Sequence, residues 1–227
     1  MDLAKLTETL GVKVDAELLT QALTHRSFAY ENGGIPNSER LEFLGDSVLG
    51  FVVTEHIYHS LPDYTEGELT NVKSRLVSEK TLALVAKELG LGEQLRLGRS
   101  EDNKVGRNRP SLLCDAFEAV LAAVFLSAGF EAARKLIETH IFPLLSDPEA
   151  LRYQVDPKTW IVELSDAREL GKVTYEVVSS GPPHDPVFEA TVLLGGVKFG
   201  TAAAKTKKTA EAAAAQAALQ VLRETHE

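Results

Sequence analysis

Three carboxylates lie within one strongly apolar segment of this chain. On a helical wheel, at about 100° per residue, Glu39, Glu42 and Asp46 fall within an arc of about 60°. The opposite side consists of residues that we expect to face the core: Leu41, Leu44, Val48, Phe51 and Val52. Because Leu49 and Val53 continue the acidic stripe as apolar surface, the helix is apolar nearly all round, which is typical of a buried helix. Ionised acids on a buried helix are costly unless they are paired or metal-bound, so we expect a cation here.

A second apolar segment, residues 111–126, supplies a matching pair of acids. Asp115 and Glu118 are three residues apart and therefore share one helix face, flanked by the small side chains of Ser111 and Ala122. If both pairs face one cleft, the four carboxylates cannot all ionise without a counter-ion. Oxygen ligands favour hard divalent ions such as Mg²⁺, which suit phosphoryl transfer by metal-activated water. The alternative interpretation is an ordinary solvated acidic face.

Four sequence blocks carry these acids and their neighbours. They are residues 23–27 (LTHRS), 39–49 (ERLEFLGDSVL), 66–70 (EGELT) and 115–119 (DAFEA). In type and order these blocks resemble those of the ribonuclease III family, and the resemblance covers essentially the whole chain. It implies an all-α catalytic domain followed by a small α+β (α-β-β-β-α) double-stranded RNA-binding domain.

The resemblance also implies roles for individual side chains. The catalytic and metal-binding roles fall to four inner carboxylates: Glu42, Asp46, Asp115 and Glu118. Among them, Glu118 would be the principal Mg²⁺ ligand, and Asp46 a partner of the metal or of the attacking water. Glu39 and Glu66 would form an outer pair that positions RNA and supports cleavage.

The implied reaction is hydrolysis of phosphodiester bonds in double-stranded RNA, in rRNA and mRNA processing. The products would carry 5′-phosphate and 3′-hydroxyl ends with short 3′ overhangs, because the two sites of a homodimer can cut opposite strands. The implied cofactor is Mg²⁺, with Mn²⁺ as a substitute and no organic cofactor, and one or two ions can act. A homodimer agrees with Phe43, Leu49 and Val53, which lie on or near the acidic face and would otherwise be hard to bury.

Composition limits the remaining classes of protein. The chain has 227 residues, 44% of them apolar, which is more than one average domain and enough for real cores. Residues 112–126 are interrupted by Asp115 and Glu118, and the N-terminus lacks the form of a signal peptide. We therefore expect a cytoplasmic protein without a membrane span. The single cysteine, Cys114, is expected to be a buried small hydrophobe.

The net charge of −9, taken alone, argues against a nucleic-acid-binding protein. Residues 1–150 carry 15 Lys and Arg against 23 Asp and Glu, whereas residues 151–227 carry 9 against 10. The acidity is therefore concentrated in the half that contains the candidate metal site.

The N-terminal half is helical in pattern up to about Leu145, so we expect the catalytic domain to span residues 1–146, followed by a linker over residues 147–156. Asp15 and Ser78 are predicted helix N-caps. Residues 91–110 are predicted to be an irregular, mobile loop that leads into the next helix. Four basic side chains in that region face either phosphate or solvent, and both interpretations stay open: Arg99, Lys104, Arg107 and Arg109.

The C-terminal half changes period. Helices are predicted over residues 158–170 and 207–222, and strands over residues 173–178, 188–194 and 197–201. This order resembles a double-stranded RNA-binding domain, expected over residues 157–227, which would recognise A-form shape. The resemblance places RNA contacts at Thr159, His184, Lys205, Lys207 and Lys208. The lysines stand at or near a helix N-terminus, which favours anion binding.

This domain departs from the family pattern at four positions. Family members usually carry Gln in place of Val162 and Ala212, and Gly near Ala202 and Ala204. Alanine adopts a positive φ less readily than glycine. We therefore predict the fold together with only modest RNA affinity.

Two other functions are alternatives to the endonuclease. A catalytically inactive double-stranded RNA-binding protein would keep the fold, but the loss of an inner carboxylate would signal it, and all four are present. An all-helical interaction module does not explain two buried acid pairs. His56, His59 and His140 are expected to be surface or partly buried histidines and not ligands. His25 is expected to be structural, and Trp160 to be a packing residue.

Overall fold

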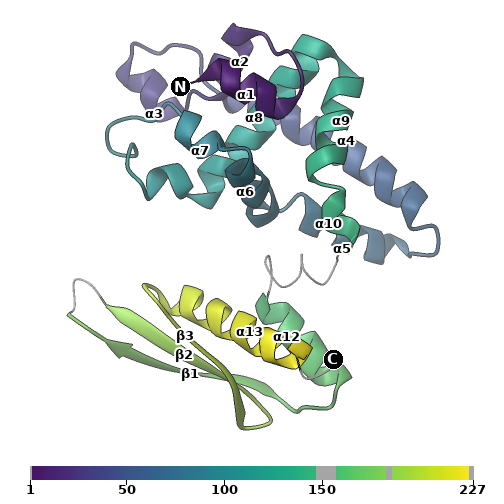
Figure 1. The fold of residues 1–227 in the computed structure, drawn as a ribbon, viewed down its shortest axis with the longest axis vertical. Helices are drawn as coiled ribbons and strands as arrows, with labels where there is room; N and C mark the ends of the chain where they lie inside the picture. The colour runs from purple at the N-terminus through teal and green to yellow at the C-terminus, as the bar shows by residue number, and fades with distance from the viewer. Residues whose placement is uncertain (1, 147–156, 183–185, 225–227) are drawn as a thin grey trace. The chain divides into compact units, whose positions relative to one another are not determined.

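The computed structural model describes residues 2–146, 157–182 and 186–224. The chain divides into two compact units, Met1–Ser146 and Asp147–Glu227 (Figure 1). The predicted boundary between domains at residue 146 coincides with this division.

All the named elements among the described residues of the first unit are helices. Its elements are α1 (Leu3–Leu10), α2 (Ala16–Ala22), α3 (Arg26–Glu31), α4 (Glu39–Ser60), α5 (Glu66–Leu76), α6 (Glu79–Glu88), α7 (Leu91–Gln94), the 3₁₀ helix η1 (Gly106–Asn108), α8 (Pro110–Ala128), α9 (Phe130–His140) and α10 (Pro143–Ser146). Side chains cap several helices as predicted: Asp15 accepts from backbone N–H groups at the start of α2, and Ser78 does so at the start of α6. The predicted helical domain is confirmed.

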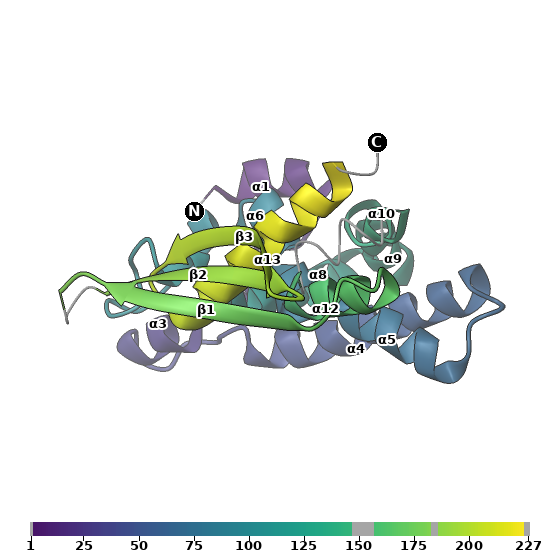
Figure 2. The same cartoon turned by 90° about the horizontal axis from the view of Figure 1, so that it is seen from below.

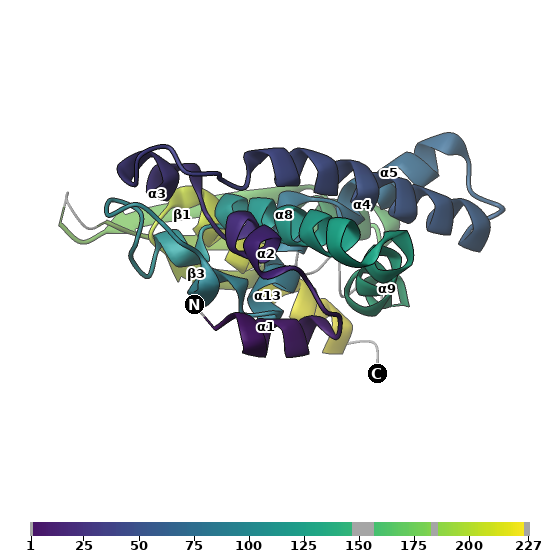
Figure 3. The same ribbon diagram turned by 90° about the horizontal axis from the view of Figure 1, so that it is seen from above.

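Helix α8 forms the centre of this unit, where α2, α4, α6 and α9 pack around it (Figure 3). Its side chains are buried from Ala116 to Val124 without interruption. By length and composition α8 is apolar enough to cross a membrane, a test that the core helix of a soluble protein also passes. Because 61% of its most apolar window is buried inside the protein, α8 is a core helix.

The buried face of α4 differs from the predicted one. Leu49 and Val53, expected beside the acids as exposed apolar surface, are 0% exposed, whereas Phe51, expected in the core, is 60% exposed. The buried face is thus rotated by several tens of degrees toward the acidic stripe. A helical wheel cannot predict this rotation, because a helix that is apolar nearly all round has two candidate core faces. The acids consequently border the contact between α4 and α8.

The second unit contains helix α12 (Pro157–Ala167), strands β1 (Val173–Ser180), β2 (Val187–Leu194) and β3 (Val197–Ala204), and helix α13 (Lys207–Glu224). The strands form an antiparallel sheet in the order β1-β2-β3, with a bulge at Val192 and Leu193. Both helices pack on one face of the sheet (Figure 2). The predicted order of helix, three strands and helix is confirmed.

The alanine-rich part of α13 is a packing surface. Ala210, Ala214, Ala215 and Ala218 are fully buried against the sheet and α12. Small side chains allow the helix to approach the strands closely. Trp160 is also buried in this core, as predicted.

Candidate active site

Helices α4 and α8 bring the inner acids together. Glu42 and Asp46 lie on α4, Asp115 and Glu118 lie on α8, and the two helices pack against each other. Gly45 marks a point of very close approach, because a Cβ atom there would lie 1.8 Å from the carbonyl oxygen of Glu118. The backbones therefore touch at the level of the acids, and any larger side chain at Gly45 would push them apart.

The four inner carboxylates form one electrostatic cluster. Glu118 is 9% exposed, and its pKa is raised to about 8 by burial first and then by repulsion from Asp46, Glu42 and Asp115. Burial also raises the pKa of Asp115, although His25 nearby opposes this shift. The pKa of Glu42 is raised by burial and then by repulsion from Asp115. Such a cluster attracts a cation, because ionisation of one acid disfavours ionisation of the others.

The donor set fits a hard divalent cation. Cys114, Asp115 and Glu118 each offer one ligand atom, and these three atoms lie within 4.8 Å of one another. The Cys114 Sγ is 4.0 Å from the Glu118 Oε1, and burial raises the pKa of this thiol far above its ordinary value. A protonated thiol is a poor ligand, so carboxylate oxygens are the ligands that remain. The predicted burial of Cys114 is confirmed.

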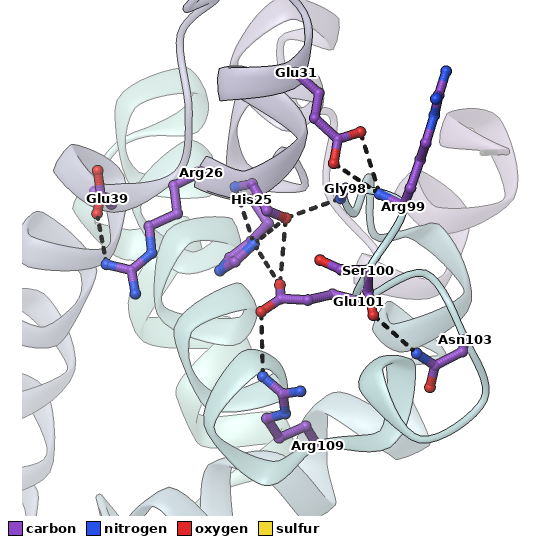
Figure 4. A network of polar contacts seen from close by, with 11 residues as sticks. His25, Arg26, Glu31, Glu39, Gly98, Arg99, Ser100, Glu101, Asn103 and Arg109 are labelled. Atoms are coloured by element: carbon purple, nitrogen blue, oxygen red, sulfur yellow. Dashed lines mark hydrogen bonds and ion pairs between the residues drawn. The ribbon is translucent and has the colours of Figure 1, made fainter.

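A polar network borders the acids on the side of α3 and the loop that precedes α8. Figure 4 shows Glu101 at its centre: its Oε2 lies 3.0 Å from Nδ1 of His25 and accepts from the Ser27 hydroxyl at 3.3 Å. Its Oε1 lies 3.4 Å from Nη1 of Arg109, the residue before α8. His25 in turn lines a small cavity together with Asp115. The network therefore connects α3, the loop and the start of α8 beside the site.

The two outer acids lie on different helices: Glu39 begins α4, and Glu66 begins α5. Glu39 is the first residue of α4, where it accepts from Asn37 Nδ2 at 3.0 Å and lies 3.5 Å from Nη1 of Arg26. Glu66 begins α5 beyond the other end of α4, and it accepts from the Thr70 hydroxyl at 3.0 Å. A helix of 22 residues is about 33 Å long, so the length of α4 separates Glu39 from the loop that leads to Glu66.

Two of the four basic side chains named above are engaged within the protein. The Arg107 guanidinium donates to three backbone carbonyls between residues 92 and 95, and Arg109 belongs to the network around Glu101. Arg99 extends away from that network (Figure 4), and Lys104 is exposed as well. Of the four candidates for phosphate contact, Arg99 and Lys104 are therefore the ones whose side chains form no ion pair among the described residues.

Comparison with known proteins adds to this geometry. A family model described as Ribonuclease-III-like matches residues 15–145, and one described as Double-stranded RNA binding motif matches residues 157–222. The chain is 44% identical over 222 residues to Ribonuclease 3 of Thermobifida fusca, covering 98% of this chain and 92% of that protein. It is 48% identical over 221 residues to Ribonuclease 3 of Leifsonia xyli subsp. xyli, with coverages of 97% and 93%. This chain belongs to the ribonuclease III family.

A solved structure supports the same assignment for the helical unit. The nuclease domain of ribonuclease III from Campylobacter jejuni aligns with a TM-score of 0.58 and 39% identity, covering 62% of this chain and 96% of that one. This ribonuclease III family member is an endoribonuclease that combines a nuclease domain with a double-stranded RNA-binding domain. Its family consists of metal-dependent nucleases, in agreement with the carboxylate cluster.

Three of the five predicted RNA-contacting residues lie on the two helices of the C-terminal domain. Thr159 is exposed in the first turn of α12, Lys207 and Lys208 are exposed in the first turn of α13, and Lys205 is exposed just before it. His184 lies outside the described residues. Their contacts with RNA stay predictions.

The two alanines of β3 that stand where the family usually has glycine are not strained. Ala202 and Ala204 pair with Ala190 and Phe188 of β2, and neither has a positive φ. Alanine therefore fits these positions without strain. Val162 is 43% exposed on α12, so it presents an apolar side chain where the family usually carries an amide.

Two residues of this ribonuclease III site were missed by sequence reasoning. Gly45 sets the distance between the helices, and its signal was a glycine in the middle of a long helix, where glycine costs about 1 kcal/mol relative to alanine. Glu101 joins three segments, but it stands in a charged loop and nothing in the sequence distinguishes it from its acidic neighbours.

Proposed function

We propose that this protein is a Mg²⁺-dependent endonuclease that hydrolyses double-stranded RNA to products with 5′-phosphate and 3′-hydroxyl ends and short 3′ overhangs. Its role would be the processing of rRNA and mRNA in the cytoplasm, and Mn²⁺ would substitute for Mg²⁺. The observation that carries this proposal is the position of Glu118, which is buried among three other carboxylates with its pKa raised to about 8. A divalent cation would allow this carboxylate to ionise near neutral pH.

The inner acids have different proposed roles, according to how deeply each side chain is buried. Glu118 and Asp115 project from the core helix, so they are held rigidly and are suited to bind the metal. Asp46 is exposed at the margin of the cluster, where it can accept a hydrogen bond from the attacking water. When bound, Mg²⁺ would polarise the phosphodiester and activate that water. Glu39 and Glu66 would support RNA positioning.

A homodimer would cover an apolar stripe on α4. Phe43 is 77% exposed, Phe51 is 60% exposed and Tyr58 is 65% exposed, and their spacing of eight and seven residues places them on one side of the helix. The C. jejuni structure is described as showing flexibility in a region involved in dimer formation. A second copy of this chain would bury the stripe and place two sites on opposite strands of a duplex.

The test is cleavage of a long labelled RNA duplex by the purified protein, with Mg²⁺ and with chelator. Glu118→Gln should reduce cleavage by about 10³-fold or more, because it removes a metal ligand, while gel-shift affinity for the duplex stays unchanged. Glu131→Gln, an exposed acid on α9, is the matched control and should cleave normally. Retained cleavage by Glu118→Gln would remove the metal assignment.

The same assay tests the alternative function. Duplex binding without cleavage by the unaltered chain, at any concentration of Mg²⁺ or Mn²⁺, would identify a catalytically inactive double-stranded RNA-binding protein.

A further inference from the structure

An ion pair connects the two helices of the RNA-binding domain that carry the predicted RNA contacts. Nζ of Lys158, in the first turn of α12, lies 2.6 Å from Oε2 of Glu211, in the second turn of α13. The Glu211 side chain is only 14% exposed and that of Lys158 is 40% exposed. A partly buried, short ion pair holds its partners in place more firmly than an exposed one.

The position of Lys158 is defined by a second contact. Its Nζ lies 4.9 Å from the centroid of the Tyr175 ring on β1, so the ammonium group sits between an aromatic face and a carboxylate. The Tyr175 hydroxyl is buried and has no hydrogen-bond partner among the described residues, and burial raises its pKa to about 12, with Glu211 adding to the shift. Lys158 is therefore directed into the domain and toward α13.

Glu211 also has competing partners on its own helix. It follows Lys207 by four residues and Lys208 by three, and both spacings favour ion pairs on the surface of a helix. Among the residues that the structure describes, neither lysine has an ion pair. Glu211 contacts Lys158 instead, although both lysines are within reach by helical spacing.

We propose that Lys158 is a positioning residue that captures Glu211, so that the ammonium groups of Lys207 and Lys208 stay available for RNA phosphates. Without Lys158, the Glu211 carboxylate would pair with one of these lysines and neutralise it where the phosphate should bind. The inference rests on the proposed RNA contact of the two lysines.

The experiment compares the full chain with Lys158→Met, Glu211→Gln and the double variant. Affinity for a labelled RNA duplex is measured by gel shift in chelator, which prevents cleavage, over a range of salt concentrations. Lys158→Met alone should weaken binding about threefold to tenfold and lower the salt slope by about 1, because one phosphate contact is lost. In the Glu211→Gln background, the same substitution should change affinity less than about twofold, since no carboxylate remains to be captured.

Three controls make the outcome specific. Lys158→Arg keeps the pair and should bind as the unaltered chain does. Glu176→Gln removes a carboxylate that lies 3.9 Å from Lys198, and both side chains of this pair are exposed. It therefore measures how much duplex affinity rises when one negative charge is removed and the Lys158 ion pair is kept. Thermal unfolding followed by circular dichroism verifies that each variant is folded.

The remaining outcomes would overturn the inference. An equal loss from Lys158→Met in both backgrounds would mean that Lys158 contacts RNA directly, and no loss in either would mean that Glu211 does not compete. Lys207→Met combined with Lys208→Met distinguishes these failures from a failure of the proposed RNA contact. If that variant binds the duplex normally, α13 does not bind RNA.

Discussion

In each of the two units, a glycine lies where the backbones of two packed elements approach very closely. In the nuclease unit, a Cβ atom at Gly45 would lie 1.8 Å from the carbonyl oxygen of Glu118. In the RNA-binding unit, a Cβ atom at Gly200 of β3 would lie 2.4 Å from the carbonyl oxygen of Ala214 on α13. The first contact lies inside the candidate active site, whereas the second lies within the apolar core between the sheet and α13.

The difference between these contacts shows how the two sites are constructed. The nuclease unit forces like charges together in the core, so its site depends on the exact spacing of the helices and on a cation. The RNA-binding unit keeps its charges exposed at the start of a helix, above a core of small side chains. A small displacement should therefore affect catalysis more than it affects binding.

Of the substitutions at these two close contacts, Gly45→Ala is expected to have the larger effect. The added methyl group must push α4 away from α8, which should lower the free energy of unfolding by about 1–3 kcal/mol. A misplacement of about 1 Å in the acids should reduce cleavage about 100-fold. Denaturant unfolding and single-turnover cleavage with excess enzyme measure the two effects.

Gly50→Ala provides the matched control on the same helix. A Cβ atom at Gly50 has nothing within 4 Å in the chain, so this substitution should stabilise the folded chain by about 0.5–1 kcal/mol and leave the spacing of α4 and α8 unchanged. Normal cleavage by Gly45→Ala would show that helix spacing does not control the site.

An intermediate effect is expected for Gly200→Ala. Its methyl group would displace α13 from β3 and destabilise the second unit by about 1–3 kcal/mol. Duplex affinity should fall about tenfold at physiological salt, while the single-turnover cleavage rate at saturating enzyme and low salt stays unchanged. Gel shift and single-turnover cleavage separate the two. A reduced rate for the bound duplex would break the distinction between the units.

The smallest expected effect is a pH dependence of stability without metal. In the folded chain the pKa of Glu118 is about 8, against an ordinary value of 4.5, so between these values the folded state binds more protons than the unfolded state. Stability should therefore fall as pH rises from 5 to 8, lowering the melting temperature in chelator by a few degrees more than in Glu118→Gln. Equal pH profiles for both proteins would contradict this. Added Mg²⁺ should reduce the fall.

The sequence by itself was sufficient for several features that depend on local chemistry, although α7 and η1 fall in a segment predicted to be irregular. The N-caps at Asp15 and Ser78, the order of strands and helices in residues 157–227, and the pairing of acids at three- and four-residue spacing were all predictable. These features follow from backbone geometry within a few residues, which a single chain segment determines.

The tertiary structure decided which surfaces meet. It buried Leu49 and Val53 but exposed Phe51, bound Arg107 to backbone carbonyls, and joined Glu101 to His25. These outcomes depend on partners from distant segments, so local patterns cannot distinguish between the alternatives. The approach of α4 to α8 at a single glycine is the clearest case, because it results from the fit between two helices and makes four separate acids into one site.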